Sequence, residues 1–293
     1  MNSLFNLIGG TPLVEITRFG TNPNVKIYGK LEGQNPGGSV KDRAAFGMIS
    51  EALKRGDIKA GDKLVEATSG NTGIALAMIA QAFGLEMTLL MPENSTIERV
   101  QAMKAYGAEV ILTPAEGTIE YSREQAEKMA RDDGYYMLNQ FANADNWGMH
   151  YRTTGPEIWN DTKGEITHFV SAMGTTGTIM GVSRYLKEQN STIQIVGTQP
   201  AEGSSIPGIR RWSPEFLPKI FYPKRVDRTI EVSEDGAREM AVKLSKQEAI
   251  MSGMSSGGAL YAALEIASEL SSGMIVFIVC DRGDRYLSSG LFD

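Results

Sequence analysis

The lysine at position 41 lies in a sequence setting suited to covalent chemistry. Ser39 can cap the helix that follows, because its hydroxyl can accept a free backbone N–H. Residues 40–53 place apolar side chains on one helical face, and Gly56 follows as a C-terminal stop. Lys41 therefore falls in the first turn, where the positive end of the helix dipole disfavours an ammonium and a neutral amine can form a Schiff base. Most lysines are solvated surface residues, so a reactive Lys41 needs support from other parts of the sequence.

A loop at residues 68–73 could bind a carboxylate. It joins a short expected strand to an expected buried helix and offers four hydrogen-bonding side chains. Its glycines let the backbone approach a ligand closely, and free N–H groups at a helix N-terminus favour an anion. A well-capped turn without a ligand explains the same Ser, Thr and Asn residues, and the loop alone does not separate the two readings.

A second loop, at residues 174–178, could hold a phosphate. Backbone amides and three threonine hydroxyls suit an anion in this position before a helix. The loop lacks the Gly-Lys-Ser/Thr ending of a nucleotide-binding P-loop, and no acidic residue follows the next strand to hold a ribose. A single phosphate monoester is the better ligand. The Ser- and Gly-rich residues 253–258 also enter a helix, but such clusters mark loops generally.

Strands and helices alternate along the chain, which predicts an α/β fold. Strands are expected at residues 11–16, 26–31, 64–67, 87–91, 110–112, 135–138, 168–172, 194–198 and 274–279. Helices are expected at residues 40–55, 74–83, 95–107, 119–131, 146–160, 179–188, 235–247 and 259–270. The segment 146–160 is irregular, with Pro156 near a helix start. The helix at 95–107 should open with a capping box. Such alternation indicates mostly parallel, twisted sheets with helices on both faces.

Two domains are expected, with the ligand in the cleft between them. Residues 35–145 would form the N-terminal α/β domain, and the region of about 86–131 within it would be a mobile subdomain. Residues 1–34 and 146–293 would form the second α/β domain, which carries the phosphate loop. The residues themselves indicate a boundary near 145, and the N-terminal strands could belong to either sheet. The Pro- and Gly-rich residues 199–224 are too long for a simple connector.

Composition excludes several classes of protein. The chain has 293 residues, 42% of them hydrophobic, and a net charge of −6 without a basic run, which argues against sequence-independent nucleic-acid binding. A single cysteine, Cys280, excludes an internal disulfide framework and fits a reducing compartment. No secretory leader and no stretch long enough to span a membrane are found, so a cytoplasmic protein is expected.

A reactive lysine, a monophosphate cradle and a carboxylate loop are what pyridoxal phosphate acting on an amino acid requires. Five motifs carry a resemblance, in order and spacing, to one family: residues 10–13 (GTPL), 39–43 (SVKDR), 68–73 (TSGNTG), 174–178 (GTTGT) and 255–257 (SSG). On these motifs the chain resembles the cysteine synthases of fold type II, the β-family of pyridoxal-phosphate enzymes, over essentially its whole length. Residues 210–212 (RRW) and 280–286 (CDRGDRY) resemble the B-type members in particular.

The resemblance implies a role for each matched residue. Lys41 would hold the cofactor through its amine and then move the Cα proton of the substrate. Asn71 would bind the 3′ oxygen of the ring, and Ser255 would face the pyridine nitrogen. The phosphate would be held by Gly174, Thr175, Thr176, Gly177 and Thr178. The substrate carboxylate would be bound by Thr68, Ser69, Gly70, Thr72 and Gln140.

Arg210 and Arg211 lie beside Trp212 in the long Gly/Pro stretch. Two adjacent guanidinium groups could receive an anionic sulfur donor such as thiosulfate, with Arg210 the first candidate. A solvated basic pair on a loop is the alternative. Cys280, by contrast, ends an apolar strand and is expected in the core, although the end of a strand leaves an indirect role at the site open. The two histidines lack metal-ligand spacing and are expected to be structural.

The expected activity is β-replacement in cysteine biosynthesis. O-acetyl-L-serine and sulfide would give L-cysteine and acetate, or thiosulfate would give S-sulfocysteine. A related lyase or dehydratase of the same fold, such as a cystathionine β-synthase-like or serine/threonine dehydratase enzyme, is one alternative. A non-catalytic amino-acid-binding protein is another, which an intact Lys41 argues against. The resemblance also implies a homodimer acting on small molecules, with no metal, nucleic acid or membrane partner.

Overall fold

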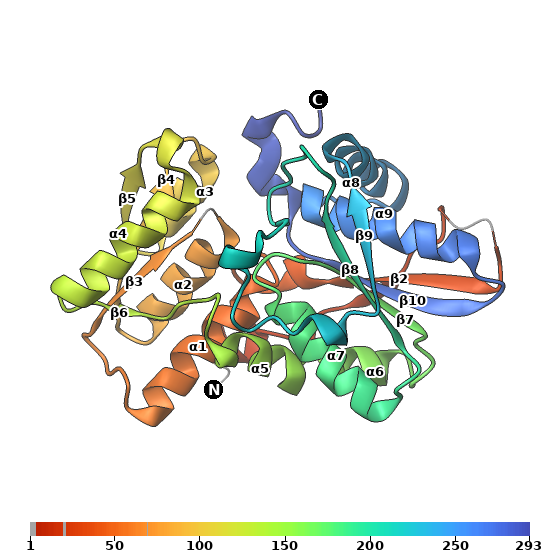
Figure 1. Ribbon diagram of the computed structural model, residues 1–293, viewed down its shortest axis with the longest axis horizontal. Coiled ribbons are helices and arrows are strands. Elements are labelled where there is room, and N and C mark those ends of the chain that lie inside the picture. Colours follow the sequence, from red (N-terminus) through yellow and green to blue (C-terminus); the bar gives the residue numbers. More distant parts are fainter. Residues whose placement is uncertain (1–3, 20–21, 69) are drawn as a thin grey trace.

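The larger of two sheets draws on both ends of the chain in the computed structural model, which describes residues 4–19, 22–68 and 70–293. Its strands lie in the order β1 (Leu13–Glu15), β2 (Val25–Leu31), β10 (Gly273–Val279), β7 (His168–Ala172), β8 (Gln194–Pro200) and β9 (Arg228–Val232). β1 pairs antiparallel with β2, and the other neighbouring strands pair parallel. The C-terminal strand β10 therefore lies in the middle of the sheet, beside the early strand β2 (Figure 1).

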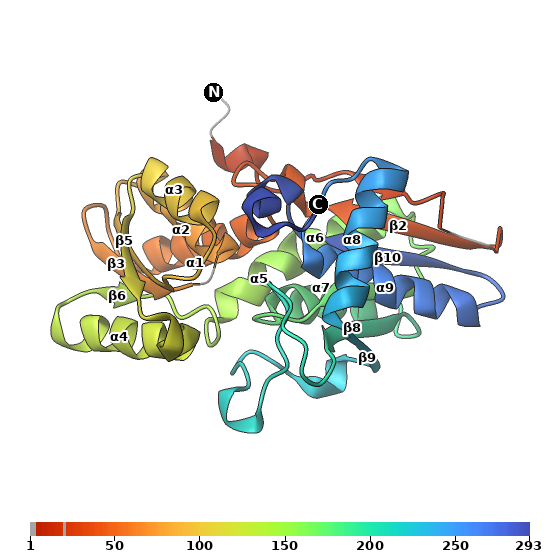
Figure 2. The same ribbon diagram turned by 90° about the horizontal axis from the view of Figure 1, so that it is seen from above.

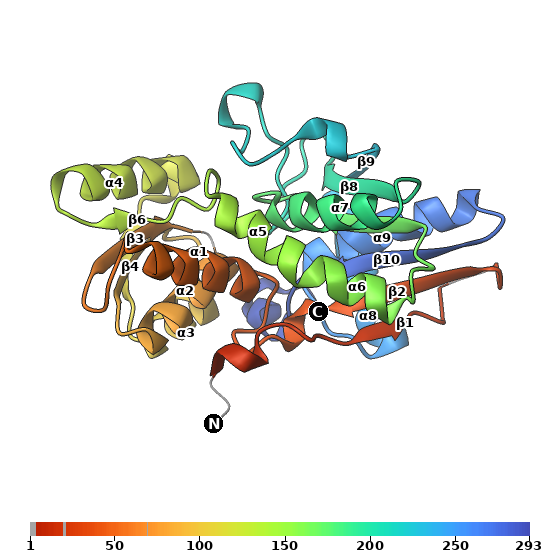
Figure 3. The same ribbon diagram turned by 90° about the horizontal axis from the view of Figure 1, so that it is seen from below.

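Both faces of this sheet are covered, as the continuous apolar sequence of its central strand requires. In β10, Ile275 and Phe277 face one core cluster, while Val276 and Ile278 face another. The first cluster is closed by α8 (Glu234–Glu248) and α9 (Met254–Glu269), and the second by α6 (Thr154–Asp161) and α7 (Gly177–Gln189). Figures 2 and 3 show these helix pairs on opposite sides of the sheet.

The smaller sheet is parallel throughout and lies at the left of Figure 1. Its order is β5 (Glu109–Thr113), β4 (Glu86–Pro92), β3 (Lys63–Ala67) and β6 (Tyr136–Met137). One face packs on α1 (Lys41–Arg55), α2 (Asn71–Ala82) and α3 (Ile97–Ala105), and the other on α4 (Thr118–Asp132). Helix α5 (Ala144–Arg152) leads from this half to the larger one.

Short 3₁₀ helices complete the described chain: η1 (Leu4–Leu7), η2 (Glu32–Gln34), η3 (Ala115–Gly117), η4 (Pro214–Phe216), η5 (Pro223–Arg225) and η6 (Gly283–Ser289). Residues 201–222 project from the larger half in Figures 2 and 3. Among the helices of the described ranges, none combines the length and apolar content that a membrane span needs.

The α/β fold predicted from the sequence is confirmed, and most expected elements match within a few residues. The irregular helical segment expected at 146–160, with a helix start near Pro156, consists of two helices: α5 and α6 meet at Thr153, whose φ of −128° and ψ of −68° interrupt the helix. β9 was not expected, and α9 begins five residues earlier than predicted, at Met254. The capping box expected between Ser95 and Glu98 does not form: the N-cap is Thr96, Ser95 N donates to Pro92 O at 3.1 Å, and Glu98 accepts from Ser288 instead.

Candidate functional site

Lys41 begins α1 directly beside the end of the central strand β10. Val40 N donates to Cys280 O at 2.8 Å, and Ser39 forms an isolated bridge with Asp281. Ser39 Oγ accepts the Lys41 backbone N–H at 3.2 Å, so the hydroxyl does serve the helix start, although the N-cap position itself is Val40. The Lys41 side chain is half-buried. The backbone pairings of Ser39 and Val40 thus attach the start of α1, and with it Lys41, to the end of β10 in the larger sheet.

A buried ion network surrounds Arg43, in the same first turn of this helix. Arg43 Nε donates to Glu32 Oε2 at 2.7 Å, and its two terminal nitrogens donate to both oxygens of Glu157 at 2.7 Å. Lys30 Nζ lies 3.0 Å from Glu157 Oε2, and Thr11 Oγ1 donates to Glu32 Oε1 at 2.6 Å. Burial raises the pKa of Glu32, but the Arg43 guanidinium outweighs it and holds that pKa at about 2. The network ties α1 to the N-terminal strands and α6.

The 68–73 loop meets Gln140, as expected. Thr72 Oγ1 donates to Gln140 Oε1 at 2.9 Å, and Gln140 Nε2 donates to Ala67 O at 3.2 Å. Thr68 Oγ1 accepts the backbone N–H groups of Gly70 and Gly73 at 3.2 and 3.1 Å, so it also stabilises the start of α2. The expected carboxylate contact Ser69 lies outside the described residues. The hydroxyls of Thr68 and Thr72 and the Gln140 amide therefore lie together.

Asn71 is held by two residues from the end of the chain. Its Nδ2 donates to Asp281 Oδ2 at 2.6 Å, and its Oδ1 accepts from Arg285 Nη1 at 2.6 Å. Arg285 also donates to Gly37 O at 2.8 Å, in the turn before Lys41. These bonds fix which end of the Asn71 amide donates and bring it close to the start of α1.

The 174–178 loop opens α7 beside α5. Asn146 Nδ2 donates to Thr175 Oγ1 at 3.3 Å and to Gln140 O at 2.8 Å, so one amide joins both candidate binding loops. Thr176 has a left-handed φ of 70°, and its buried Oγ1 has no hydrogen-bond partner among the described residues. Thr178 Oγ1 lies 3.3 Å from His150 Nε2.

His150 is a buried neutral base behind this loop. Burial, and then the nearby Arg43 charge, lower its pKa to about 3. Its Nδ1 lies 2.8 Å from Thr154 Oγ1, so both ring nitrogens have hydroxyl partners. His150 was expected to be structural; its contact with Thr178 of the 174–178 loop was not predicted.

Ser255 lies buried in the first turn of α9, next to Gly208, which in turn approaches Gly174 of the 174–178 loop. Gly208, at φ +89°, would place a methyl group 3.2 Å from Ser255 Cβ, and Gly174 would place one 2.8 Å from Gly208 O. Asp281 Oδ1 accepts the backbone N–H of Gly253 at 3.1 Å, which ties the start of α9 to the end of β10. Asp281 therefore contacts the starts of α1, α2 and α9.

The two neighbouring arginines diverge. Arg210 N donates to Met173 O at 2.9 Å, and its side chain is half-buried next to the segment that packs on Ser255. The exposed Arg211 instead pairs with Glu231 Oε1 of β9 at 2.6 Å. Trp212 Nε1 donates to Gly174 O at 2.8 Å and covers the 174–178 loop.

Sequence reasoning gave no site role to Asn146, Asp281 or Arg285. The last two stand in the quoted 280–286 motif, which was the one available signal. Cys280 is buried, as expected, and burial raises the pKa of its thiol to about 11, so the thiol stays protonated. Its backbone carbonyl, not its sulfur, makes the contact with the start of α1.

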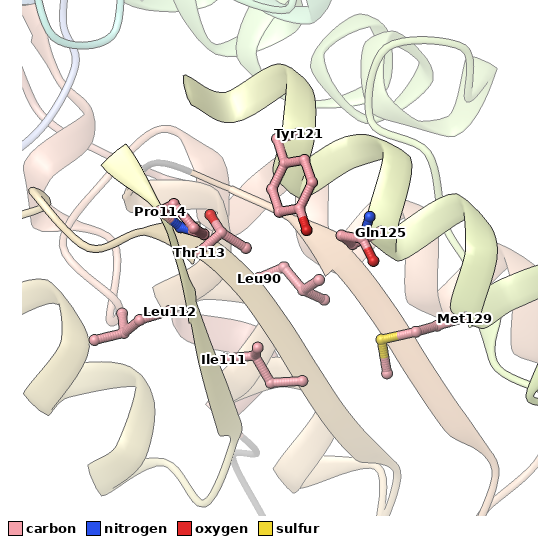
Figure 4. Close-up of a pocket in the computed structure, with 8 residues that line it drawn as sticks. All are labelled: Leu90, Ile111, Leu112, Thr113, Pro114, Tyr121, Gln125 and Met129. Atoms are coloured by element: carbon pink, nitrogen blue, oxygen red, sulfur yellow. The ribbon is translucent and has the colours of Figure 1, made fainter. Parts of the chain in front are cut away.

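A separate hollow of about 280 Å³ lies in the smaller half, between β5 and α4 (Figure 4). Its apolar floor is formed by Leu90 and Ile111, with Tyr121 and Met129 facing them from α4. None of the residues lining it belongs to the loops just described. The candidate site is therefore defined by the converging loops rather than by this hollow.

Comparisons with known proteins agree on one family. The family model "Pyridoxal-phosphate dependent enzyme" matches residues 4–281. Cysteine synthase B of Pseudomonas aeruginosa is 56% identical over 291 residues, which cover 99% of this chain and 97% of that protein. A solved cysteine synthase from Entamoeba histolytica superposes with a TM-score of 0.93 at 39% identity, covering 100% of this chain and 90% of that one. An O-ureido-L-serine synthase structure superposes with a TM-score of 0.94 at 34% identity, covering 100% and 95%.

Proposed function

The chain belongs to the pyridoxal-phosphate-dependent enzymes and, within them, to the cysteine synthases, and on this premise we propose how its residues carry out the reaction. It is an O-acetylserine sulfhydrylase of cysteine biosynthesis that uses pyridoxal phosphate. The observation that carries the assignment of residues is that Asp281 contacts the starts of the three helices that carry Lys41, Asn71 and Ser255. Its backbone pairs with Ser39, and its carboxylate accepts hydrogen bonds from Asn71 Nδ2 and from the backbone N–H of Gly253.

The residues present fit the cofactor. The buried hydroxyl of Thr176, which lacks a partner among the described residues, and the N-terminus of α7 suit the phosphate. At Gly177 a larger residue would collide with Asn146, so glycine is what lets the loop pack against α5. We assign the phosphate to residues 174–178, the ring oxygen to Asn71, and the ring nitrogen to Ser255.

Pyridoxal phosphate, when bound, supplies an electron sink that makes the Cα–H bond of the amino acid acidic. In our assignment the Lys41 amine holds the cofactor covalently at rest and afterwards takes the proton from Cα. Thr68, Thr72 and Gln140 bind and orient the substrate carboxylate, and a hydroxyl at Ser255 offers the ring nitrogen a neutral partner. Departure of acetate from Cβ, addition of sulfide at the same carbon and return of the proton from Lys41 to Cα would then give L-cysteine and acetate.

Arg210 is the proposed receptor for an anionic sulfur donor such as thiosulfate. It is half-buried and lies two residues after Gly208, which packs on Ser255. The guanidinium geometry suits bidentate binding of an oxyanion. Arg211 is left out of this role, because its ion pair with Glu231 holds it at the outer strand β9.

The two sheets support a division into two domains, which we propose at residues 35–145 against 1–34 with 146–293. The region of about 86–131, which holds β4, α3, β5 and most of α4, is the part proposed to move on substrate binding. A homodimer in the cytoplasm is also proposed; light scattering of the purified protein would check the dimer.

The assay that tests the proposed function compares O-acetyl-L-serine plus sulfide with L-serine alone. We expect rapid L-cysteine formation from the first pair and no pyruvate from L-serine. Turnover of L-serine without a sulfur donor would indicate a dehydratase, and binding of amino acids without turnover of either would indicate a non-catalytic protein.

A further inference from the structure

Arg99, in the first turn of α3, packs directly on the backbone of the 68–73 loop. It is 8% exposed, and a methyl group built on Gly70 would lie 2.9 Å from Arg99 Nε and 3.1 Å from Cζ. Its Cζ also lies 5.0 Å from the centre of the Tyr286 ring. The planar guanidinium therefore fills the space between a loop of the smaller half and a ring from the C-terminal segment.

The same turn of α3 is fastened to η6. Ser288 donates to both carboxylate oxygens of Glu98, from its backbone N at 3.0 Å and from its hydroxyl at 2.7 Å. Figures 1 and 2 show η6 beside α3, between the two halves of the molecule. Because Glu98 and Arg99 are consecutive, this pair fixes where the Arg99 side chain starts.

Tyr286 closes the arrangement on its other side. Its hydroxyl donates to Asp281 Oδ2 at 2.6 Å, the same oxygen that accepts the Asn71 amide at 2.6 Å. The ring also fills the space next to Gly253, at the start of α9. Arg99 thus packs on Gly70, and Asp281 binds Asn71. Tyr286 contacts both Arg99 and Asp281 and so links these two interactions.

We propose that Arg99 is a positioning residue for the substrate carboxylate, acting through Gly70. The inference rests on the proposed function of the 68–73 loop. The Arg99 guanidinium lies between Gly70 and the Tyr286 ring and so fixes the position of Gly70. The Arg99 charge lies behind the N–H groups and hydroxyls assigned to the carboxylate. A buried cation in this place favours an anionic group on the far side of the loop, since surrounding protein screens it less than water would.

The test measures the dissociation constants of two amines from the holoenzyme by the absorbance change of the bound cofactor. L-Alanine carries the carboxylate and no leaving group, and ethylamine lacks the carboxylate. In Arg99→Met we expect L-alanine to bind about tenfold more weakly, the effect of losing one partly screened charge, while ethylamine binding stays unchanged. Lys104→Met removes a cation from the exposed end of the same helix and should change neither constant.

A second variant keeps the positive charge but lacks the planar guanidinium group. Arg99→Lys should recover part of the lost L-alanine affinity and retain a loss of about threefold, because an ammonium cannot stack on both Gly70 and Tyr286. Equal weakening of both ligands, or no weakening of L-alanine in either variant, would overturn the proposal. If the wild-type enzyme makes cysteine and the variants bind L-alanine normally, this inference alone is lost; if the wild-type enzyme does not make cysteine, the proposed function is lost.

Discussion

The adjacent residues Arg210 and Arg211 differ in exposure and in partners. One lies half-buried beside the loop that packs on Ser255, and the other is tied to Glu231 on the outer strand. An exposed ion pair of this kind contributes little to stability, but it does fix where the guanidinium points. We therefore propose Arg210, and not Arg211, as the charge that receives an anionic sulfur donor.

Replacing Arg210 by alanine should separate the two sulfur donors. We expect the kcat/KM for thiosulfate to fall by about tenfold to a hundredfold, since a charge-assisted bond to an anion is lost, and that for sulfide to change little. Arg211→Ala serves as the control and should leave both values near those of the wild type. Equal losses for thiosulfate and sulfide in Arg210→Ala would remove this residue from donor binding.

Glu66 is a fully buried carboxyl on β3, next to the backbone of Asn139 and Gln140. Burial raises its pKa to about 8, even though the backbone N–H of Asn139 donates to Oε2 at 2.8 Å. Its folded-state pKa lies above the unfolded value of 4.5, so the unfolded chain binds fewer protons between these values. Folding stability should therefore fall as pH rises through that window.

Glu66→Gln should remove this pH dependence. Glutamine resembles the neutral acid, so the variant should gain stability over the wild type as pH rises toward 8, on the order of 4 kcal/mol at the upper end. Below the unfolded pKa the two proteins should be similar. Urea unfolding across this pH range measures the difference, and a gap that does not change with pH would show that Glu66 stays ionised.

At the residue scale the sequence revealed the parts of the site that are contiguous. Lys41 and the 68–73 and 174–178 loops each carry their signal within a few positions, in glycines, hydroxyls and a helix start. Asp281 gains its role only from contacts with Asn71, 210 positions away, and with Gly253. Such pairings are set by how the strands are ordered in space, which local patterns do not encode.

Elements were predictable where the periodicity was regular. β7 spans the residues expected, because its apolar run is bounded on both sides by polar residues. Thr153 divides the segment 146–160 just before Gly155 and Pro156, and Pro156 in the first turn of α6 was the available sign of a helix start. β9 is an edge strand with two buried residues out of five, so its apolar signal is weak. The start of α9 is rich in Ser and Gly, and close packing on its neighbours, not propensity, makes it helical.

Helix α1 depends on the Arg43 network for its place. Arg43→Met should lower the free energy of unfolding by about 3–5 kcal/mol, because the carboxylates of Glu32 and Glu157 lose their buried partner. Urea unfolding near neutral pH measures this loss. Since the pKa of Glu32 is held at about 2, its contribution should persist above the unfolded value of 4.5 and fade as pH falls toward 2.

The control for this change lies at the other end of the same helix. Arg55 makes exposed ion pairs with Asp57 and Asp145, and Arg55→Met should shift the urea midpoint far less. Comparable shifts for the two variants would mean that the buried network does not anchor α1.

At the scale of the whole molecule, the site is shared between two sheets. Lys41 and Asn71 start helices of the smaller half, while residues 174–178 and Ser255 belong to the larger half. Asn146 and Asp281 make the hydrogen bonds that join them. A ligand held by both halves lowers the free energy of the arrangement in which they are close, so substrate binding should favour closure.

Hydrogen exchange should detect this closure. Adding L-alanine to the holoenzyme should slow amide exchange in residues 86–131, whereas exchange in β10 and α9 should stay as it is. Protection limited to the 68–73 loop, with none in residues 86–131, would contradict a moving subdomain.

The covalent attachment of the cofactor at Lys41 is the claim on which the assignment of residues depends most. Borohydride reduction of the holoenzyme followed by peptide mapping measures it directly. We expect one modified peptide, with the pyridoxyl group on Lys41, and no modified peptide in Lys41→Ala. A reduced cofactor on another lysine, or none at position 41, would contradict the account.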